Sequence, residues 1–446
     1  MYCISQYNNP TPINILDSSE AGHPPLHLHH VCTILLVGMK PSILIGRFFL
    51  AAALSGAAWP VFAKSPTLPM APKKWTIMVY LNGKSNLEEN HFHRLNSLES
   101  AGSDAGMNIV AEYSRMRGQD EDFTGDSDWT GSRRYYITLD SDPNALKSPV
   151  LEQTDMVDSG DWRRVANFIK WAKKNFPAER YLLLYRFHGM GWIDPEKPKG
   201  KAMNFDDETG NFTATAEISQ ILKEAGGVDL YLQDVCMMQS LEVLYEIKDY
   251  AKIAIGAETL SYGFNYYLLA SAISASPAIS NTELAKSVLS TYRGDYGRSG
   301  FNYQLSAVNT SALGDMAVQV RRWTAAVMRV NDRAAALEAK KNVTRFTNTQ
   351  YADLKLFAGI FLKNLHADLP GAQELAAETR SLLSVLDNRL VLDNITVGEK
   401  MSGLGGVSVY VPDGNNDLWA ISQHAALNFG KDSGWTDFAR YLKDIN

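Results

Sequence analysis

Cysteine is scarce in this chain, which has three such residues among 446: Cys3, Cys32 and Cys236. The first two lie in a segment that we expect to be removed, so Cys236 is expected to be the single thiol of the mature protein. One cysteine excludes a disulfide framework within one chain and a zinc site built from cysteines. The simplest role for such a residue is that of a small buried hydrophobe. A free thiol in an exported protein is exposed to oxidation, however, which gives weight to a chemical role.

An excess of positive charge and long hydrophobic runs are also missing. The formal net charge is -6, which argues against a nucleic-acid partner. The longest apolar stretch near the N-terminus, over 48–58, is shorter than the ~20 residues that a membrane span needs. With 45% hydrophobic residues, the chain can nevertheless build more than one core.

The N-terminal segment predicts export. Lys40 and Arg47 form a positive region after Met39, the apolar stretch follows, and small residues lead to Ala63. This order is typical of a secretory signal peptide cleaved after Ala63, which we prefer over a retained anchor. We interpret residues 1–63 as a signal peptide preceded by a mis-start, with Met39 as the true start. The mature protein is then secreted or periplasmic, with no membrane attachment after signal removal, and its Pro-rich residues 64–74 form a leader.

Short apolar runs rich in β-forming residues alternate with helix signals from Trp75 onward. Runs without polar alternation are typical of strands buried on both faces. The alternation predicts an α/β fold, an α/β/α sandwich with a mostly parallel central sheet. Expected strands are 75–81, 107–114, 133–140, 181–187, 228–236 and 251–260. Expected helices include one that begins at Leu87 and is capped by Ser85 or Asn86, one over 160–176, and one that starts with "LEVLYEI" (241–247), whose N-terminus is expected near Met237.

Two residues capable of chemistry follow predicted strands. His188 comes directly after 181–187, and Cys236 ends 228–236. Active sites of open α/β sheets form at the carboxyl ends of strands, so neighbouring strands would bring imidazole and thiol together. The helix N-terminus near Met237 and an imidazolium at His188 both favour the reactive thiolate. His188 can protonate a leaving amine, and the N–H groups of Gly189 and Cys236 can hold an oxyanion. The pattern predicts acyl transfer by a Cys–His dyad.

Other interpretations of these residues remain open. A histidine before glycine is often only a turn residue, and Asp234 can simply cap a turn. A metallohydrolase built on His91 and His93 is a further alternative. Those two histidines lack the i, i+4 spacing of a helical zinc site, do not share a helix face, and are expected at the surface.

The stretches "YLLLYRFHGMGW" and "VDLYLQDVCMMQSLEVLYEI" together resemble the clostripain family of cysteine peptidases, which has a caspase-like fold. The resemblance extends from about residue 74 to 442 through "WTIMVYLNGKSNLEE", "YADLKLF" and "GLGGVSVYVPDG". The residues that match the family motifs are His188, Gly189, Gly191, Trp192, Asp234, Cys236, Met238 and Glu242. Departures occur at Phe187, Met190, Val235 and Met237; they leave the nucleophile and the base in place and affect the expected detail of the substrate pocket.

The resemblance implies an endopeptidase that cleaves protein or peptide substrates after Arg or Lys. A basic side chain requires a carboxylate in its pocket, for which Asp234 is the first candidate and Glu258 the second. The resemblance also implies self-activation by cleavage between the dyad residues. Lys199 and Lys201 lie there in a polar loop, and cutting after either would give a light chain with His188 and a heavy chain with Cys236. The alternatives are a plain surface loop and an uncut monomer.

The resemblance places a caspase-like peptidase domain at 75–280, and 281–446 is expected to complete the sheet and add helices. No cofactor or metal is expected to be required. Calcium, which some relatives use, is the one ion considered, at the acidic residues 206–208, although no complete ligand loop is present. A catalytically silent binding protein on the same fold is the main alternative function. Slow alkylation of Cys236 and an uncut loop would identify it.

Overall fold

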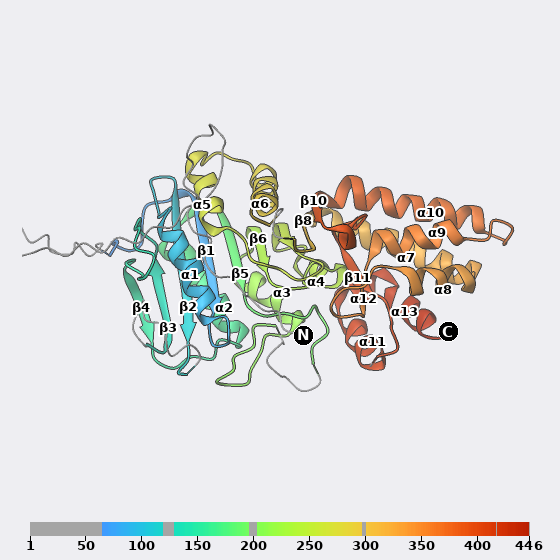
Figure 1. The fold of residues 1–446 in the computed structure, drawn as a ribbon, viewed down its shortest axis with the longest axis horizontal. Coiled ribbons are helices and arrows are strands. Elements are labelled where there is room, and N and C mark those ends of the chain that lie inside the picture. Colours follow the sequence, from blue (N-terminus) through green and yellow to red (C-terminus); the bar gives the residue numbers. More distant parts are fainter. Residues whose placement is uncertain (1–64, 119–128, 196–202, 297–299, 416, 446) are drawn as a thin grey trace, which may run out of the picture. The chain divides into compact units, whose positions relative to one another are not determined.

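The computed structural model describes residues 65–118, 129–195, 203–296, 300–415 and 417–445 (Figure 1). The predicted signal peptide and the predicted cleavage sites Lys199 and Lys201 lie outside these ranges. These described residues belong to one compact unit. Among the described residues, no helix combines the length and the apolar character that a membrane crossing requires.

The described residues form a nine-stranded sheet in the order β10-β8-β7-β6-β5-β1-β2-β3-β4. The five central strands, from β7 to β2, are parallel, and the strands added at both edges are antiparallel. The predicted mostly parallel sheet is therefore confirmed. The strands are β1 (Lys73–Asn82), β2 (Met107–Arg115), β3 (Gly131–Tyr136), β4 (Val150–Thr154), β5 (Ala178–Arg186), β6 (Val228–Asp234), β7 (Ala251–Gly256), β8 (Tyr303–Asn309) and β10 (Val391–Val397).

Strand β1 shows why the central strands lack polar alternation. Ile77 and Val79 point into a core that also contains residues of α1, α5 and α6. Tyr80 points to the other face, where its ring lies 6.0 Å from that of Phe168 on α2. Because helices cover both faces, nearly every position of the strand must be apolar or paired.

Two rows of helices cover the sheet (Figure 1). Helices α2, α3 and α4 contact one another in turn on the face of Tyr80, and α1, α5 and α6 do so on the face of Ile77. This arrangement is the predicted α/β/α sandwich. The helices are α1 (Glu88–Glu99), α2 (Trp162–Asn175), α3 (Thr215–Glu224), α4 (Leu241–Ile247), α5 (Tyr266–Ala275) and α6 (Asn281–Tyr296).

The chain after β8 forms a helical group whose core is aromatic. Helix α7 contacts α10, α12 and α13 (Figure 1). The Trp323 ring of α7 stacks on Trp435 at 6.0 Å and meets Phe438 edge-on at 5.3 Å. The elements are α7 (Leu313–Val330), α8 (Arg333–Asn342), α9 (Leu354–Asn364), α10 (Ala372–Val385), α11 (Asp417–Ala426), α12 (Asn428–Ser433), α13 (Trp435–Lys443), and a two-stranded sheet of β9 (Tyr351–Asp353) and β11 (Ser408–Tyr410).

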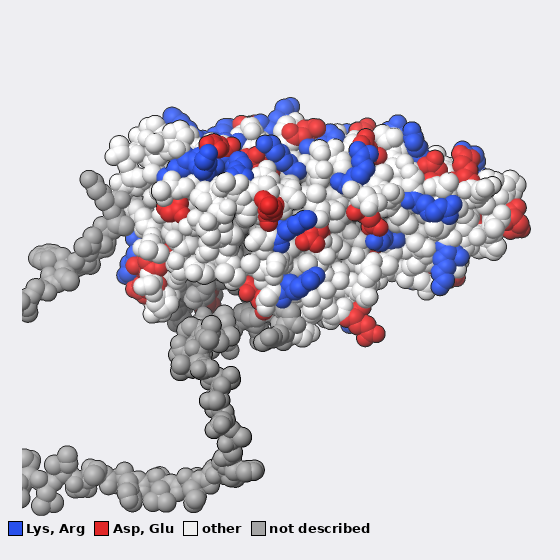
Figure 2. All heavy atoms as spheres, turned by 90° about the horizontal axis from the view of Figure 1, so that it is seen from above, with Lys and Arg blue, Asp and Glu red and all other residues white. Residues whose placement is uncertain are grey.

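Surface charges of both signs are mixed. On the face drawn in Figure 2, basic and acidic side chains are interspersed, and neither sign forms a continuous patch. Such a face offers no stripe of positive charge that would follow a phosphate backbone.

Candidate active site

The two predicted reactive residues emerge side by side from the sheet. Strands β5 and β6 are parallel neighbours, and their last paired residues are Arg186 and Asp234. His188 and Cys236 each follow two residues later, at the same edge. A methyl group on Gly189 would lie 2.4 Å from Val235 Cγ1 and 3.2 Å from the Cys236 carbonyl oxygen. Only glycine therefore lets the chain after His188 lie directly against the backbone at Cys236.

The sulfur of Cys236 is enclosed by the loop that follows β7. Cys236 is 5% exposed, and its Sγ accepts a hydrogen bond from the Ser261 N–H at 3.4 Å. An N–H that points at sulfur favours negative charge there. The next residue, Met237, has a φ of 58°, a left-handed conformation that side chains of its kind rarely adopt. Strained residues of this type cluster at functional sites, because the surrounding structure must hold them in place.

The helix expected from about Met237 begins later. Helix α4 starts at Leu241, and the Ser240 side chain caps it by accepting from the Val243 N–H. The left-handed Met237 turns the chain away from a helical path directly after the nucleophile. The helix over 241–247 is thus where the sequence predicts it, but its N-terminus lies at Ser240 and not near Met237.

His188 has a partner that the sequence did not indicate. Its Nε2 donates to Asn86 Oδ1 at 2.7 Å. Asn86 was expected to cap α1, but that helix begins at Glu88 after Leu87, without a side-chain cap. The amide of Asn86 instead holds the imidazole from the turn between β1 and α1. A base oriented by a third group is the arrangement that nucleophilic catalysis requires.

Asp234 lies below the reactive pair and is fully hydrogen-bonded. Its carboxylate forms an ion pair with Arg186 Nη1 at 2.7 Å. It also accepts from Ser261 Oγ at 3.0 Å, from the Phe264 N–H at 3.4 Å and from the Tyr266 hydroxyl at 3.0 Å. Ser261 thus contacts both Asp234, through its hydroxyl, and Cys236, through its N–H. The pairing of Arg186 with Asp234 was not foreseen from the sequence.

Glu258, the second candidate for binding a basic side chain, lies in the core. It is fully buried, and burial together with the nearby Asp353 carboxyl raises its pKa well above the usual range. Burial also raises the pKa of Asp353 to about 6. A proton is therefore retained within this pair, and a neutral Glu258 is a poor partner for a substrate cation.

The histidines of the alternative metal site occupy different environments. His93 is half-exposed, as predicted, but His91 is fully buried and packs edge-on against the Tyr113 ring. The surface prediction for His91 is wrong because the same face of α1 carries the core residues Phe92 and Leu95. Burial, followed by the charges of Arg186, His188 and Arg94, lowers the pKa of His91 well below its usual value. Within the described part of the chain, no group of three or more histidine, cysteine or acidic residues is placed to hold a metal ion.

The acidic residues 206–208 lie beside a cation of the protein itself, the ammonium group of Lys84. The Lys84 ammonium is fully buried, forms an ion pair with Glu208, and lies 3.5 Å from Asp206 Oδ2. Asp206 also accepts hydrogen bonds from the backbone N–H groups of Ser159 and Glu208. The Lys84 ammonium therefore supplies the positive charge that lies beside Asp206 and Glu208 in this structure.

Residues of β9, β11 and α11 support the loop that carries His188. Trp192 is 1% exposed, and its ring meets those of Tyr351, Tyr410 and His424 at 6.2, 5.7 and 5.4 Å. The Ile193 N–H donates to the Tyr351 hydroxyl at 2.9 Å. The His-Gly-Met-Gly-Trp loop is thus held at one end by β5 and at the other by residues far along the chain.

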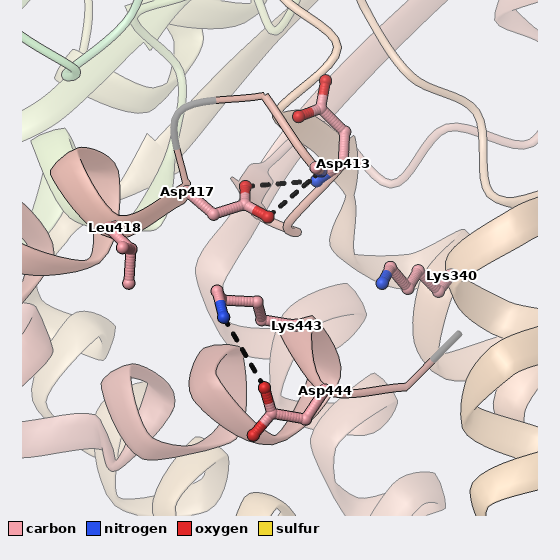
Figure 3. A pocket seen from close by; sticks show the side chains of 7 residues that line it. Lys340, Asp413, Asp417, Leu418, Lys443 and Asp444 are labelled. Carbon is pink, nitrogen blue, oxygen red and sulfur yellow. Dashed lines mark hydrogen bonds and ion pairs between the residues drawn. The ribbon is translucent and has the colours of Figure 1, made fainter.

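A pocket of about 710 Å³ lies elsewhere, between α8, α11 and α13 (Figure 3). Its charged groups interact within the protein: Lys340 binds the carbonyls of Leu442 and Ile445, and Asp417 accepts from the Gly414 N–H. None of the predicted site residues lines it. We do not connect this pocket with the reactive pair.

A thiol and an imidazole thus follow adjacent parallel strands of an α/β/α sandwich, an arrangement typical of cysteine-type peptidases. The sequence model of the Clostripain family matches residues 79–443. The chain belongs to this family of cysteine peptidases.

Individual relatives agree with this assignment. Clostripain of Hathewaya histolytica is 28% identical over 192 residues, which cover 40% of this chain and 36% of that protein, so the match spans about a third of the relative's length. A secreted C11 cysteine protease from Bacteroides thetaiotaomicron, solved with an irreversible peptide inhibitor, superposes with a TM-score of 0.60 at 20% identity over 81% of this chain and 99% of the other. An inactive zymogen C11 protease from Parabacteroides distasonis gives 0.58 at 17% identity, covering 82% and 99%. At these identities the two structures support the fold alone.

Proposed function

We propose that this protein is an exported cysteine endopeptidase in which Cys236 attacks the peptide carbonyl and His188 transfers protons. The observation that carries the proposal is the common position of both residues, two beyond the register pair of β5 and β6. In the reaction, His188 removes the thiol proton, sulfur adds to the carbonyl carbon, and the imidazolium protonates the leaving amine. Water then releases the acyl group. The N–H groups of Gly189 and Cys236 are proposed to stabilise the oxyanion.

We further propose cleavage after Arg or Lys, with Asp234 as the carboxylate that attracts the substrate's charge. Its position supports this role, because Ser261 contacts both Asp234 and the nucleophile. Secretion or release into the periplasm is proposed from the signal sequence that starts at Met39. We propose no metal cofactor for the reaction.

Self-activation is proposed at Lys199 or Lys201. The burial of Cys236 supports it, because a sulfur that is 5% exposed offers little access to a substrate in the uncut chain. Cleavage between the dyad residues would free the segment after His188 to move. The mature protein would then be a light chain paired with a heavy chain.

The test uses the chain from Lys64 as wild type, Cys236→Ala and His188→Ala, with peptides that release a fluorophore after Arg, Lys or Leu. Intact mass is recorded before and after incubation. Wild type is expected to cleave the basic peptides and to split near Lys199 or Lys201, whereas both variants do neither. Iodoacetamide should alkylate wild-type Cys236 faster than the thiol of His188→Ala. If wild type cuts nothing, stays whole and alkylates slowly, the silent binding protein becomes the better interpretation.

A further inference from the structure

The carboxylate proposed to receive a basic substrate side chain already binds a guanidinium of this protein. Arg186 and Asp234 are register partners, and both are buried. Their Nη1 and Oδ2 atoms are 2.7 Å apart, the distance of a charge-assisted hydrogen bond. The negative charge of Asp234 is therefore compensated before a substrate arrives.

Arg186 is held firmly in this position. Its Nη2 donates to Asn90 Oδ1 on α1 at 2.7 Å. Gly263, with a φ of 95°, closes over it: a methyl group there would lie 3.2 Å from Arg186 Nη1 and 2.5 Å from Arg94 Nη2. The loop after β7 therefore passes directly over two guanidinium groups, which only a glycine at this point permits.

The second guanidinium does not share the carboxylate. Arg94 donates to the carbonyls of Phe264 and Tyr262 at 2.8 and 3.3 Å, and so supports the loop from below. Burial raises the pKa of Asp295, and the nearby charge of Arg94 acts in the opposite direction. Arg186 and Arg94 thus lie close together in space, and of these two described residues Arg186 is the one that forms the ion pair with Asp234.

We propose that Arg186 is a specificity-determining residue, whose guanidinium takes the place at Asp234 that the Arg or Lys of a substrate would occupy. A substrate cation must displace Arg186 or lie beside a like charge, and both outcomes oppose binding. The discrimination between a basic residue and a neutral one of the same shape is therefore weaker than Asp234 alone would provide. This inference rests on the proposed function and deepens it.

The test compares two peptides that differ only in the residue before the cleaved bond, arginine or citrulline, which has the same shape without the charge. Protein is first incubated until its mass is constant. The ratio of kcat/KM values, arginine over citrulline, is expected below about a hundredfold in wild type. A site whose own buried polar group loses its partner when the analogue binds discriminates between the two substrates by far more. In Arg186→Met the ratio should rise at least about tenfold, mainly through a lower KM for the arginine peptide.

Two controls separate specificity from folding. Arg94→Met removes the adjacent guanidinium without touching Asp234, and its ratio should equal that of wild type. Arg186→Lys keeps the positive charge, and its ratio should stay near the wild-type value. An unchanged ratio in Arg186→Met, with equal losses on both peptides, would assign Arg186 a structural role and overturn the inference.

The wild-type ratio can overturn the inference on Arg186 even if Arg186→Met does not fold. A wild-type ratio above about a hundredfold overturns the inference and leaves the peptidase function standing. A failure of wild type to cleave any peptide overturns the proposed function, and the inference falls with it. A ratio above one but below that limit supports both, whereas a ratio near one overturns the proposed preference for basic residues and the inference with it.

Discussion

His188 Nε2 and Asn86 Oδ1 lie 2.7 Å apart, although they are separated by about a hundred residues of sequence. The bond fixes the plane of the imidazole and the nitrogen that carries its proton. Asn86 is therefore a positioning residue for the proposed base, and it comes from the first turn after β1.

Replacing Asn86 by Ala is expected to lower kcat by roughly ten- to a hundredfold, a part of what general acid–base catalysis contributes, with little change in KM. Asn86→Asp keeps an oxygen that accepts from Nε2, and it should retain most of the activity. A purely structural role would instead lower the unfolding temperature of both variants in parallel with activity. The pH profile of kcat should shift to higher pH in Asn86→Asp, because a carboxylate beside the imidazole favours its protonated form, and Asn86→Ala should lack that shift.

Replacing Asp234 by Asn is expected to reduce kcat/KM for arginine and lysine peptides by on the order of a hundredfold, and for leucine peptides far less. The reason is that only the basic peptides need its charge. Glu258→Gln is the matched control, because that carboxyl is buried against Asp353 and should affect all peptides equally. Equal losses on basic and neutral peptides in Asp234→Asn would exclude Asp234 from recognition.

The pH dependence of stability is expected to reflect His91. Its pKa in the folded protein is well below 6.5, so the unfolded chain binds the additional proton as the pH falls. The contribution of neutral His91 to the free energy of unfolding is present above pH 6.5 and is lost as the pH falls below it. This loss amounts to about 2 kcal/mol between pH 7 and pH 5. Urea unfolding of His91→Leu should show a smaller difference between these pH values than wild type. His93→Leu, on the exposed side of the same helix, should behave like wild type.

Lys84 is expected to stabilise the folded position of the acidic segment that contains Asp206 and Glu208. Lys84→Met leaves Asp206 buried without its cation and should reduce the free energy of unfolding by about 3–5 kcal/mol. Lys74→Met breaks an exposed pair with Glu179 and should cost no more than about 1 kcal/mol. Chelator should leave the unfolding temperature of wild type unchanged. A drop on adding chelator would contradict the assignment of Lys84 as the resident cation.

The central strands could be predicted well from the sequence. Short apolar runs such as that of β1 are typical of strands that helices cover on both faces. The sequence also predicted that His188 and Cys236 share a sheet edge, since strand ends in parallel sheets converge. It failed at Met237, where a left-handed residue delays the helix until Ser240 can cap it. Local helix propensity gives no sign of such a turn.

The long-range pairs were beyond sequence reasoning for a different reason. His91 packs against Tyr113 of β2, its pKa is lowered by burial and by charges that include Arg186 of β5, and the partner of Arg186 lies on a neighbouring strand. The packing of loops over the sheet decides which polar side chains meet. Neither the periodicity of the sequence nor the spacing of its motifs encodes that packing. Strand β7 also ends at Gly256, earlier than expected, because the Gln304 side chain takes up the Glu258 N–H.

The contacts of Trp192 have a consequence for how the protein comes into being. Its ring rests on Tyr410 and His424, which are among the last segments to leave the ribosome. The loop with His188 therefore lacks its support until translation is nearly finished, although the nucleophile was synthesised long before.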